Sequence, residues 1–153
     1  MKNYATIFFL LLCISTFSLA LDKGEPPPQQ ASQPFELKFK ISKQYPTPGD
    51  TVWFILSLIN HSQDTLRFNL PTPQVARFSV LRDDRPVWLS DYGMMFAQVI
   101  TPLIVIPGDS IPLKAFWLGK NNEAIWVPLG KYHIEACFNG TKQCLRDSLW
   151  LVD

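Results

Sequence analysis

An alternation of apolar and polar side chains with a period of two constrains this chain more than any other feature. Its clearest run, residues 35–42, reads FELKFKIS, with apolar residues at the odd positions and polar residues at the even ones. Successive side chains of a β-strand point to opposite faces, so this run predicts a strand with one buried and one solvated face. The same period appears in residues 111–117, IPLKAFW, which follow a Pro107-Gly108-Asp109 turn of the type II pattern.

The chain between residues 35 and 153 reads as about nine short strands separated by turns, with no convincing amphipathic helix. The 13 prolines and 7 glycines mark turns, as in PTPGD at residues 46–50. A chain of 153 residues with 47% hydrophobic content has enough apolar side chains for one packed core. We therefore predict an all-β protein whose single folded domain covers residues 35–153.

The first 20 residues, MKNYATIFFLLLCISTFSLA, read as a secretory signal peptide. Lys2 supplies the positive start, the apolar run is too short to cross a membrane, and small residues stand at Ser18 and Ala20. The alternatives are an uncleaved anchor and bacterial lipidation at Cys13, which Leu12 disfavours because that signal requires a small residue there. We expect the mature protein to be secreted or periplasmic, with no membrane association beyond the signal peptide.

Residues 21–34, LDKGEPPPQQASQP, are predicted to be a proline-rich linker that tethers the domain. Consecutive prolines favour an extended polyproline II conformation and bury no core.

The run at residues 51–60, TVWFILSLIN, is apolar on both faces, which is typical of a strand in the centre of its sheet. Trp53, Ile55 and Ile59 form the second apolar face. Either this chain's own loops or linker cover that face, or it is an exposed patch that a partner covers.

A set of motifs in the second half of the chain resembles the BsuPI-type intracellular proteinase inhibitor family over roughly residues 36–138. The matching residues are Val87-Trp88, Ser90, Gly93-Met94-Met95-Phe96, Gln98, Pro107-Gly108-Asp109-Ser110, Trp117 and Gly130-Lys131-Tyr132. The resemblance implies an immunoglobulin-like β-sandwich and, as an activity, protease inhibition. The run Pro128-Leu129-Gly130-Lys131-Tyr132 resembles the tyrosine corner before a late strand of an immunoglobulin-like sandwich, in which a Tyr hydroxyl bonds to upstream backbone.

The loop at residues 90–96 is the candidate protease contact. It consists of Ser90, Asp91, Tyr92, Gly93, Met94, Met95 and Phe96. Large apolar side chains beside a glycine suit a subtilisin-like serine protease. The alternative is that Met94, Met95 and Phe96 are core residues that begin the next strand.

Without Cys13 of the signal peptide, two cysteines remain, Cys137 and Cys144, in a chain expected in an oxidising compartment. A turn centred on Gly140 and Thr141 places them opposite each other, which predicts a disulfide. Their spacing is neither C-x-x-C nor part of a four-ligand set, so we predict no redox-active site and no metal site.

Neither catalytic motifs nor charge clusters stand out. The sequence contains no G-x-S-x-G elbow, phosphate-binding glycine loop or H-E-x-x-H, and Asp83-Asp84 reads as a hairpin turn rather than a catalytic carboxylate pair. Apart from Lys2, the 14 Lys and Arg residues leave 13 to balance 13 Asp and Glu residues, without a cationic cluster for phosphates. We predict a protein that is not an enzyme, uses no cofactor and does not bind nucleic acid.

Two functions fit these observations. The first is inhibition of a subtilisin-like serine protease through residues 90–96. The alternative is a non-inhibitory binding or structural module of the bacterial cell envelope that docks through Trp53 and its neighbours. The sequence does not indicate an oligomeric state.

Overall fold

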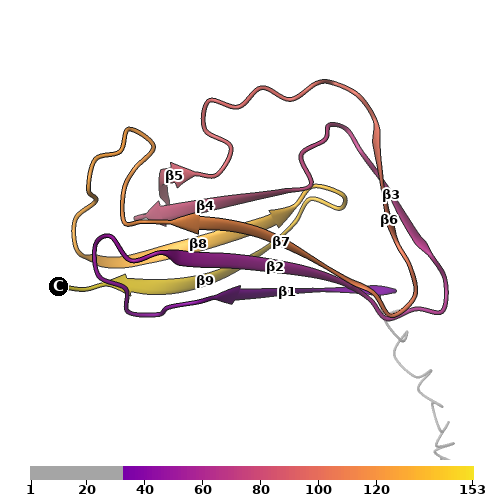
Figure 1. Ribbon diagram of the computed structural model, residues 1–153, viewed down its shortest axis with the longest axis horizontal. Helices are drawn as coiled ribbons and strands as arrows, with labels where there is room; N and C mark the ends of the chain where they lie inside the picture. The colour runs from indigo at the N-terminus through magenta and orange to yellow at the C-terminus, as the bar shows by residue number, and fades with distance from the viewer. Residues whose placement is uncertain (1–32) are drawn as a thin grey trace, which may run out of the picture. The chain divides into compact units, whose positions relative to one another are not determined.

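The computed structural model describes residues 33–153, which form nine β-strands and no helix (Figure 1). The strands are β1 (Phe35–Ile41), β2 (Val52–Asn60), β3 (Leu66–Leu70), β4 (Ala76–Arg82), β5 (Arg85–Leu89), β6 (Thr101–Val105), β7 (Ser110–Trp117), β8 (Gly130–Phe138) and β9 (Gln143–Leu151). No helix in this range therefore has the length and apolar character to cross a membrane. The predicted signal peptide and nearly all of the predicted linker lie outside the described residues.

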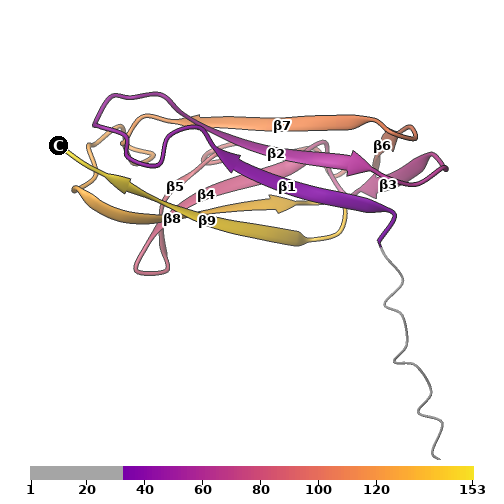
Figure 2. The same ribbon diagram turned by 90° about the horizontal axis from the view of Figure 1, so that it is seen from below.

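Two antiparallel sheets lie face to face, as Figure 2 shows from below. One sheet has the order β1-β2-β7 and the other the order β5-β4-β8-β9, while β3 and β6 pair as a separate two-stranded ribbon at one end. The predicted all-β sandwich is thereby confirmed.

The alternation of apolar and polar residues in the sequence matches an alternation of buried and more exposed side chains along the strands. In β2, every second residue from Val52 to Asn60 is buried, and β8 repeats the pattern from Tyr132 to Phe138. The two inner faces meet in a core with aromatic contacts such as Trp117 on Tyr132, with ring centroids 5.4 Å apart. Removing these apolar side chains from water is the main contribution to the stability of such a domain.

The tyrosine corner expected at residues 128–132 is present. Tyr132 is fully buried, and its hydroxyl donates a hydrogen bond to the carbonyl oxygen of Pro128. The same hydroxyl oxygen accepts a hydrogen bond of 3.2 Å from Nη1 of Arg82, so both bonding capacities of the buried group are used.

The two turns singled out in the sequence adopt the expected backbone. Asp83 and Asp84 have φ values of 50° and 57° and join β4 to β5, as in a two-residue type I′ hairpin. Gly108 has a φ of 74°, and Asp109 N–H donates to the Ile106 carbonyl at 3.1 Å, as in a type II turn. The strands on either side of this second turn do not pair with each other, because β6 pairs with β3 and β7 pairs with β2.

Asn60 is a fully buried polar residue, although its place beside a polar turn predicts exposure. Its side-chain N–H groups donate to the carbonyl oxygens of Asp64 at 2.8 Å and Val105 at 2.9 Å. Its side-chain oxygen accepts hydrogen bonds from Ser62 N and Oγ at 2.9 and 2.8 Å. Asn60 therefore fastens the end of β2 to the following turn and to the end of β6.

Candidate protein-interaction site

The segment between β5 and β6 is an exposed loop of the sandwich, and we call residues 90–100 the contact loop. The next strand begins only at Thr101. Met94 is 61% exposed and Met95 98% exposed, while Phe96 is half-buried. The alternative that Met94, Met95 and Phe96 begin the next strand in the core is therefore wrong: a chain that pairs with no strand here leaves the two methionines in solvent.

The base of the contact loop is fixed to β4. Ser90 N–H donates to the Phe78 carbonyl at 2.9 Å, and Phe78 N–H donates to Ser90 Oγ at 3.0 Å. The Asp91 carboxylate accepts a 2.9 Å hydrogen bond from Gln74 Nε2 and lies 3.3 Å from Nε of Arg77. The Asp91 side chain is only 18% exposed, whereas the Arg77 side chain is 46% exposed, so the carboxylate is held in place on the protein side while the guanidinium remains in contact with solvent.

A tight turn follows the fixed base. Tyr92 N–H donates to the Leu89 carbonyl at 3.3 Å, and Met94 N–H donates to the Asp91 carbonyl at 3.0 Å. Gly93 has a φ of 71°, which a residue with a Cβ adopts only under strain. The turn directs the next residues outward, and Met95 reaches the solvent while Met94 and Phe96 line a groove.

A groove of about 660 Å³, the β7 groove, lies between β7 and the contact loop. Its mostly apolar walls include Trp53, Trp88, Met94, Phe96, Lys114 and Phe116. The structure thus brings residues of two separately predicted sites together, since Trp53 belongs to the apolar patch and Met94 and Phe96 belong to the contact loop. Concave, largely apolar sites with a few polar groups are the usual places for binding.

The predicted apolar patch changes its composition in the structure. Trp53 is 43% exposed, but Ile55 and Ile59 on the same outer face are half-buried. Phe116, which is 49% exposed, lies directly across from Trp53 in the β2–β7 register, with ring centroids 5.5 Å apart. The phase of residues 111–117 put Phe116 on the outward side, but only the register shows that it joins Trp53.

Strand β2 is central in its sheet, between β1 and β7, as predicted. The expectation that it is covered on both sides is not met by residues 33–153, because Trp53 on its outer face stays exposed. Lys40 and Lys114 flank Ile55 in register, so charged side chains surround the apolar centre of this face. A polar rim around an apolar centre is typical of protein interfaces.

The far end of the same outer face carries an acidic group. Nε2 of His61 lies 2.7 Å from Oε2 of Glu36. That hydrogen bond is the main reason why the pKa of Glu36 is lowered from its ordinary value, and the nearby Lys38 adds to the effect. Glu36 therefore keeps its negative charge in mildly acidic solution.

A second cavity of about 660 Å³ lies against Val87 and Leu89, which point away from the β7 groove. Its polar side chains take part in folding: Arg82 donates to the Tyr132 hydroxyl, and the Asn122 amide bonds to both N and O of Leu89 at 2.8 and 2.9 Å. These internal hydrogen bonds leave this cavity a weaker candidate than the β7 groove.

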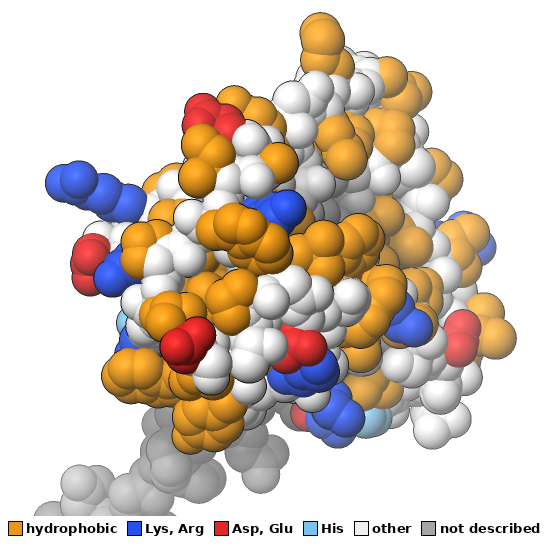
Figure 3. All heavy atoms as spheres, turned by 60° about the vertical axis from the view of Figure 1, so that its left-hand side comes forward, with side chains coloured by type: hydrophobic (Ala, Val, Ile, Leu, Met, Phe, Trp, Pro, Cys, Tyr) orange, Lys and Arg blue, Asp and Glu red, His pale blue; other side chains and the backbone are white. Residues whose placement is uncertain are grey.

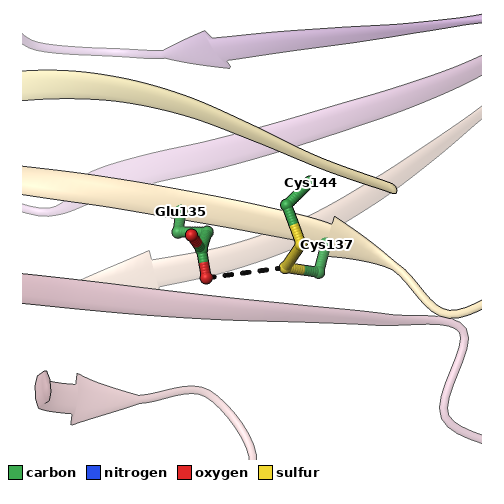
Figure 4. A group of neighbouring side chains, drawn as sticks. All are labelled: Glu135, Cys137 and Cys144. Carbon is green, nitrogen blue, oxygen red and sulfur yellow. Dashed lines mark hydrogen bonds between the residues drawn. A yellow bond between two sulfur atoms is a disulfide. The ribbon is translucent and has the colours of Figure 1, made fainter. Parts of the chain in front are cut away.

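Figure 4 shows the predicted disulfide between Cys137 and Cys144, which pair directly across β8 and β9. Oε1 of Glu135 lies 3.7 Å from Sγ of Cys137, but an oxidised sulfur has no hydrogen to donate. Although these three residues lie close enough together to suggest a metal site, bridged sulfurs are not thiolates, and thiolates are what metals bind. The two cysteines therefore form a structural disulfide that joins the strands of the β8–β9 hairpin.

The surface drawn in Figure 3 mixes apolar and charged side chains. Apolar groups reach the surface at many places, with Lys, Arg, Asp and Glu side chains interspersed between them. Contact with a partner on such a surface depends on local shape and on individual charges more than on a field of one sign.

Comparison with known proteins identifies a family. The family model BsuPI, described as intracellular proteinase inhibitor, matches residues 39–143. No curated protein matches the chain.

Likeness to solved structures is distant. The alkylpurine DNA glycosylase AlkC of Pseudomonas fluorescens, bound to DNA with an abasic site analogue, is 9% identical with a TM-score of 0.48 over 78% of this chain and 31% of its own. A β-glucosidase of Listeria innocua in complex with glucose is 11% identical with a TM-score of 0.47, over 78% of this chain and 16% of its own. These likenesses are too weak to support an argument, whereas the family model covers most of the chain. The chain belongs to the BsuPI family of intracellular proteinase inhibitors.

Proposed function

We propose that this protein is a non-enzymatic inhibitor of a subtilisin-like serine protease, and that Met95 enters the protease's pocket for a substrate side chain. The observation that carries the proposal is the 98% exposure of Met95 at the tip of a loop with a fixed base. Membership of an inhibitor family supports a protease as the partner.

The hydrogen bonds of Ser90 and Asp91 give a physical reason for tight binding. Ordering a loop on association costs free energy, about 0.5–1.5 kcal/mol for each immobilised side chain. A loop whose base is already fixed avoids part of that cost. The same restraint opposes the movement that separates the two ends of a cleaved peptide, so it favours inhibition over digestion.

The expected signal peptide places the target protease outside the cytoplasm, in the periplasm or the medium. Fractionation of cells that produce the full chain tests this location. An intact mass of the exported protein that corresponds to a chain beginning at Leu21 would support cleavage after Ala20. Recovery of the full-length chain in the cytoplasm would contradict it.

Titration of subtilisin with the purified domain, with residual hydrolysis of a chromogenic peptide as the readout, tests inhibition. We expect loss of protease activity below tens of micromolar inhibitor. Met95→Asp should weaken inhibition by about tenfold or more, because a charge must be desolvated in an apolar pocket, whereas Met95→Leu should preserve it.

Ile104→Asp is the matched control, since Ile104 is also an exposed apolar residue but lies on β6. If Met95→Asp and Ile104→Asp inhibit equally well, the contact loop is not the inhibitory element. Full protease activity in the presence of the unmodified domain would contradict inhibition of this protease.

The exposed pair Trp53 and Phe116 favours a second candidate, a non-inhibitory module that docks on another envelope protein. Aromatic residues are enriched in the centres of protein interfaces. A pull-down from envelope extract with the unmodified domain and with Trp53→Ser discriminates. Recovery of the same proteins by both would show that this pair is not the docking surface.

A further inference from the structure

Strand β7 has one edge without a partner strand in the described part of the chain. It pairs with β2 on one side only, in the order β1-β2-β7. Near the start of β7, Asn60 N–H donates to the Asp109 carbonyl and the Asn60 carbonyl accepts from Gly108 N–H, both at 3.0 Å. In an antiparallel pair, residues that bond to the partner alternate with residues whose backbone groups face away. The even-numbered residues of β7 therefore face the free edge.

These outward-facing residues differ in what they offer. Ser110 N–H is occupied by Oδ1 of Asp109 at 2.8 Å, and Pro112 has no N–H. Lys114 and Phe116 remain, each with an N–H and a carbonyl group directed at the free edge. Proline is tolerated in a strand at such a position, because the missing N–H would not bond within the sheet.

The C-terminal half of this free edge lies at the β7 groove. Lys114, Ala115 and Phe116 all line it, opposite Met94 and Phe96 of the contact loop. Consecutive side chains of a strand added beside β7 would point alternately into the sandwich and out from it. One side chain would point into the groove, and the next would lie along its outer rim beside Lys114 and Phe116.

Charge adds a requirement on the occupant. Asp91, the acidic residue of the groove, is paired with Arg77. Lys114 is exposed and forms no ion pair with any of residues 33–153. The rim of the groove therefore carries an uncompensated positive charge that complements an acidic side chain.

We propose that the β7 groove binds an extended peptide segment of another protein as an added β-strand. The segment bonds to the backbone of Lys114 and Phe116, places one large apolar side chain in the groove and pairs an acidic side chain with Lys114. Strand addition of this kind takes affinity from main-chain hydrogen bonds and specificity from pockets for alternate side chains. This site is separate from Met95, so it extends beyond the proposed inhibitory contact.

Acetylated, amidated and fluorescently labelled hexapeptides of the form Thr-Glu-X-Thr-Val-Thr test the proposal, with X as Phe, Leu or Ala. Binding to the purified domain is measured by fluorescence polarisation. We expect saturable binding of the Phe and Leu peptides, and about tenfold weaker binding of the Ala peptide, which leaves the groove unfilled. Replacing Glu with Lys in the peptide should weaken binding about threefold or more, by loss of the exposed ion pair and repulsion from Lys114.

Two variants at one position separate charge from backbone pairing. Lys114→Gln removes only the charge and should weaken binding about threefold. Lys114→Pro also removes the outward N–H, and should weaken binding about tenfold or more while leaving the melting temperature close to that of Lys114→Gln. Because a proline variant can fail to fold, amide chemical shifts of Lys114 and Phe116 in the unmodified domain give an independent readout, and both should move on peptide addition.

Three results would overturn the proposal. The first is no saturable binding of the Phe and Leu peptides up to about 1 mM, a concentration that corresponds to only about 4 kcal/mol. The second is equal binding by the folded Lys114→Pro and Lys114→Gln variants, or unchanged Lys114 and Phe116 amide shifts. The third is a dimer in sedimentation whose interface protects these two amides, which would make a second copy of the chain the occupant.

Discussion

Replacing Asn60 with alanine tests whether a buried polar residue holds one end of the sandwich together. The side chain makes four hydrogen bonds, two as donor and two as acceptor. Each contributes about 0.5–1.5 kcal/mol, and the Val105 carbonyl is left buried without that donor in the variant. We expect Asn60→Ala to lower the free energy of unfolding by about 3 kcal/mol.

Urea denaturation followed by tryptophan fluorescence measures this loss. For a domain of this size the free energy of unfolding falls by about 1.5 kcal/mol for each molar of urea, so the urea concentration at the unfolding midpoint should fall by about 2 M. Asn69→Ala is the matched control, because Asn69 is exposed on β3, and it should change stability by less than about 0.5 kcal/mol. A loss below about 1 kcal/mol for Asn60→Ala, or an equal loss for Asn69→Ala, would refute the reasoning.

Asn60→Asp sharpens the same test with pH. A carboxyl group there faces the carbonyl oxygens of Asp64 and Val105 and is buried, so its pKa should be raised in the folded state. The folded protein then binds more protons than the unfolded chain, and stability falls as pH rises above about 4. Equal destabilisation at low and neutral pH would contradict this environment.

Three further outcomes are expected. Reduction of Cys137–Cys144, or the double substitution to serine, should cost about 2–3 kcal/mol in urea denaturation, and no loss would show that the bridge adds little to stability. The hydrogen bond from Lys43 is the main cause of the lowered pKa of Asp50, so Lys43→Met should move the Asp50 midpoint in an NMR titration back toward 3.8. In the unmodified protein, the contribution of ionised Asp50 to the free energy of unfolding is present above this pH and disappears as pH falls through the lowered pKa. Pro112→Val combined with Lys114→Val should raise the apparent mass in concentration-dependent light scattering, whereas Ser110→Val should leave it unchanged, because the missing N–H of Pro112 and the like charges of Lys114 disfavour pairing between the β7 edges of two copies of this chain.

Strand positions were predictable because burial imposes a period of two on the sequence. Residues 35–42 and 111–117 were both identified as strands from that period, and the structure differs from the prediction by only a residue at their ends. The Cys137–Cys144 pair was predictable for a similar reason, since a short turn fixes which residues face each other.

Strand partners were not predictable from the same pattern. Alternation shows which side chains share a face but not which strand lies alongside, so the pairing of β2 with β7 and the resulting contact of Trp53 with Phe116 emerged only from the structure. The burial of Asn60 was not predictable for another reason: its polarity predicts exposure, and one of the groups that satisfy its side chain, the Val105 carbonyl, lies 45 residues away in the sequence.

The apolar character of β2 has a consequence for how the chain is made. The segment VWFILSLIN can pair early with its neighbour β1, but β7 is synthesised about fifty residues later. Until then, a strand with high β-propensity and no charge within it presents an open side to other nascent chains. Recovery of folded monomer from denaturant should therefore decline as the protein concentration rises, and slow dilution should favour the correctly paired sheet.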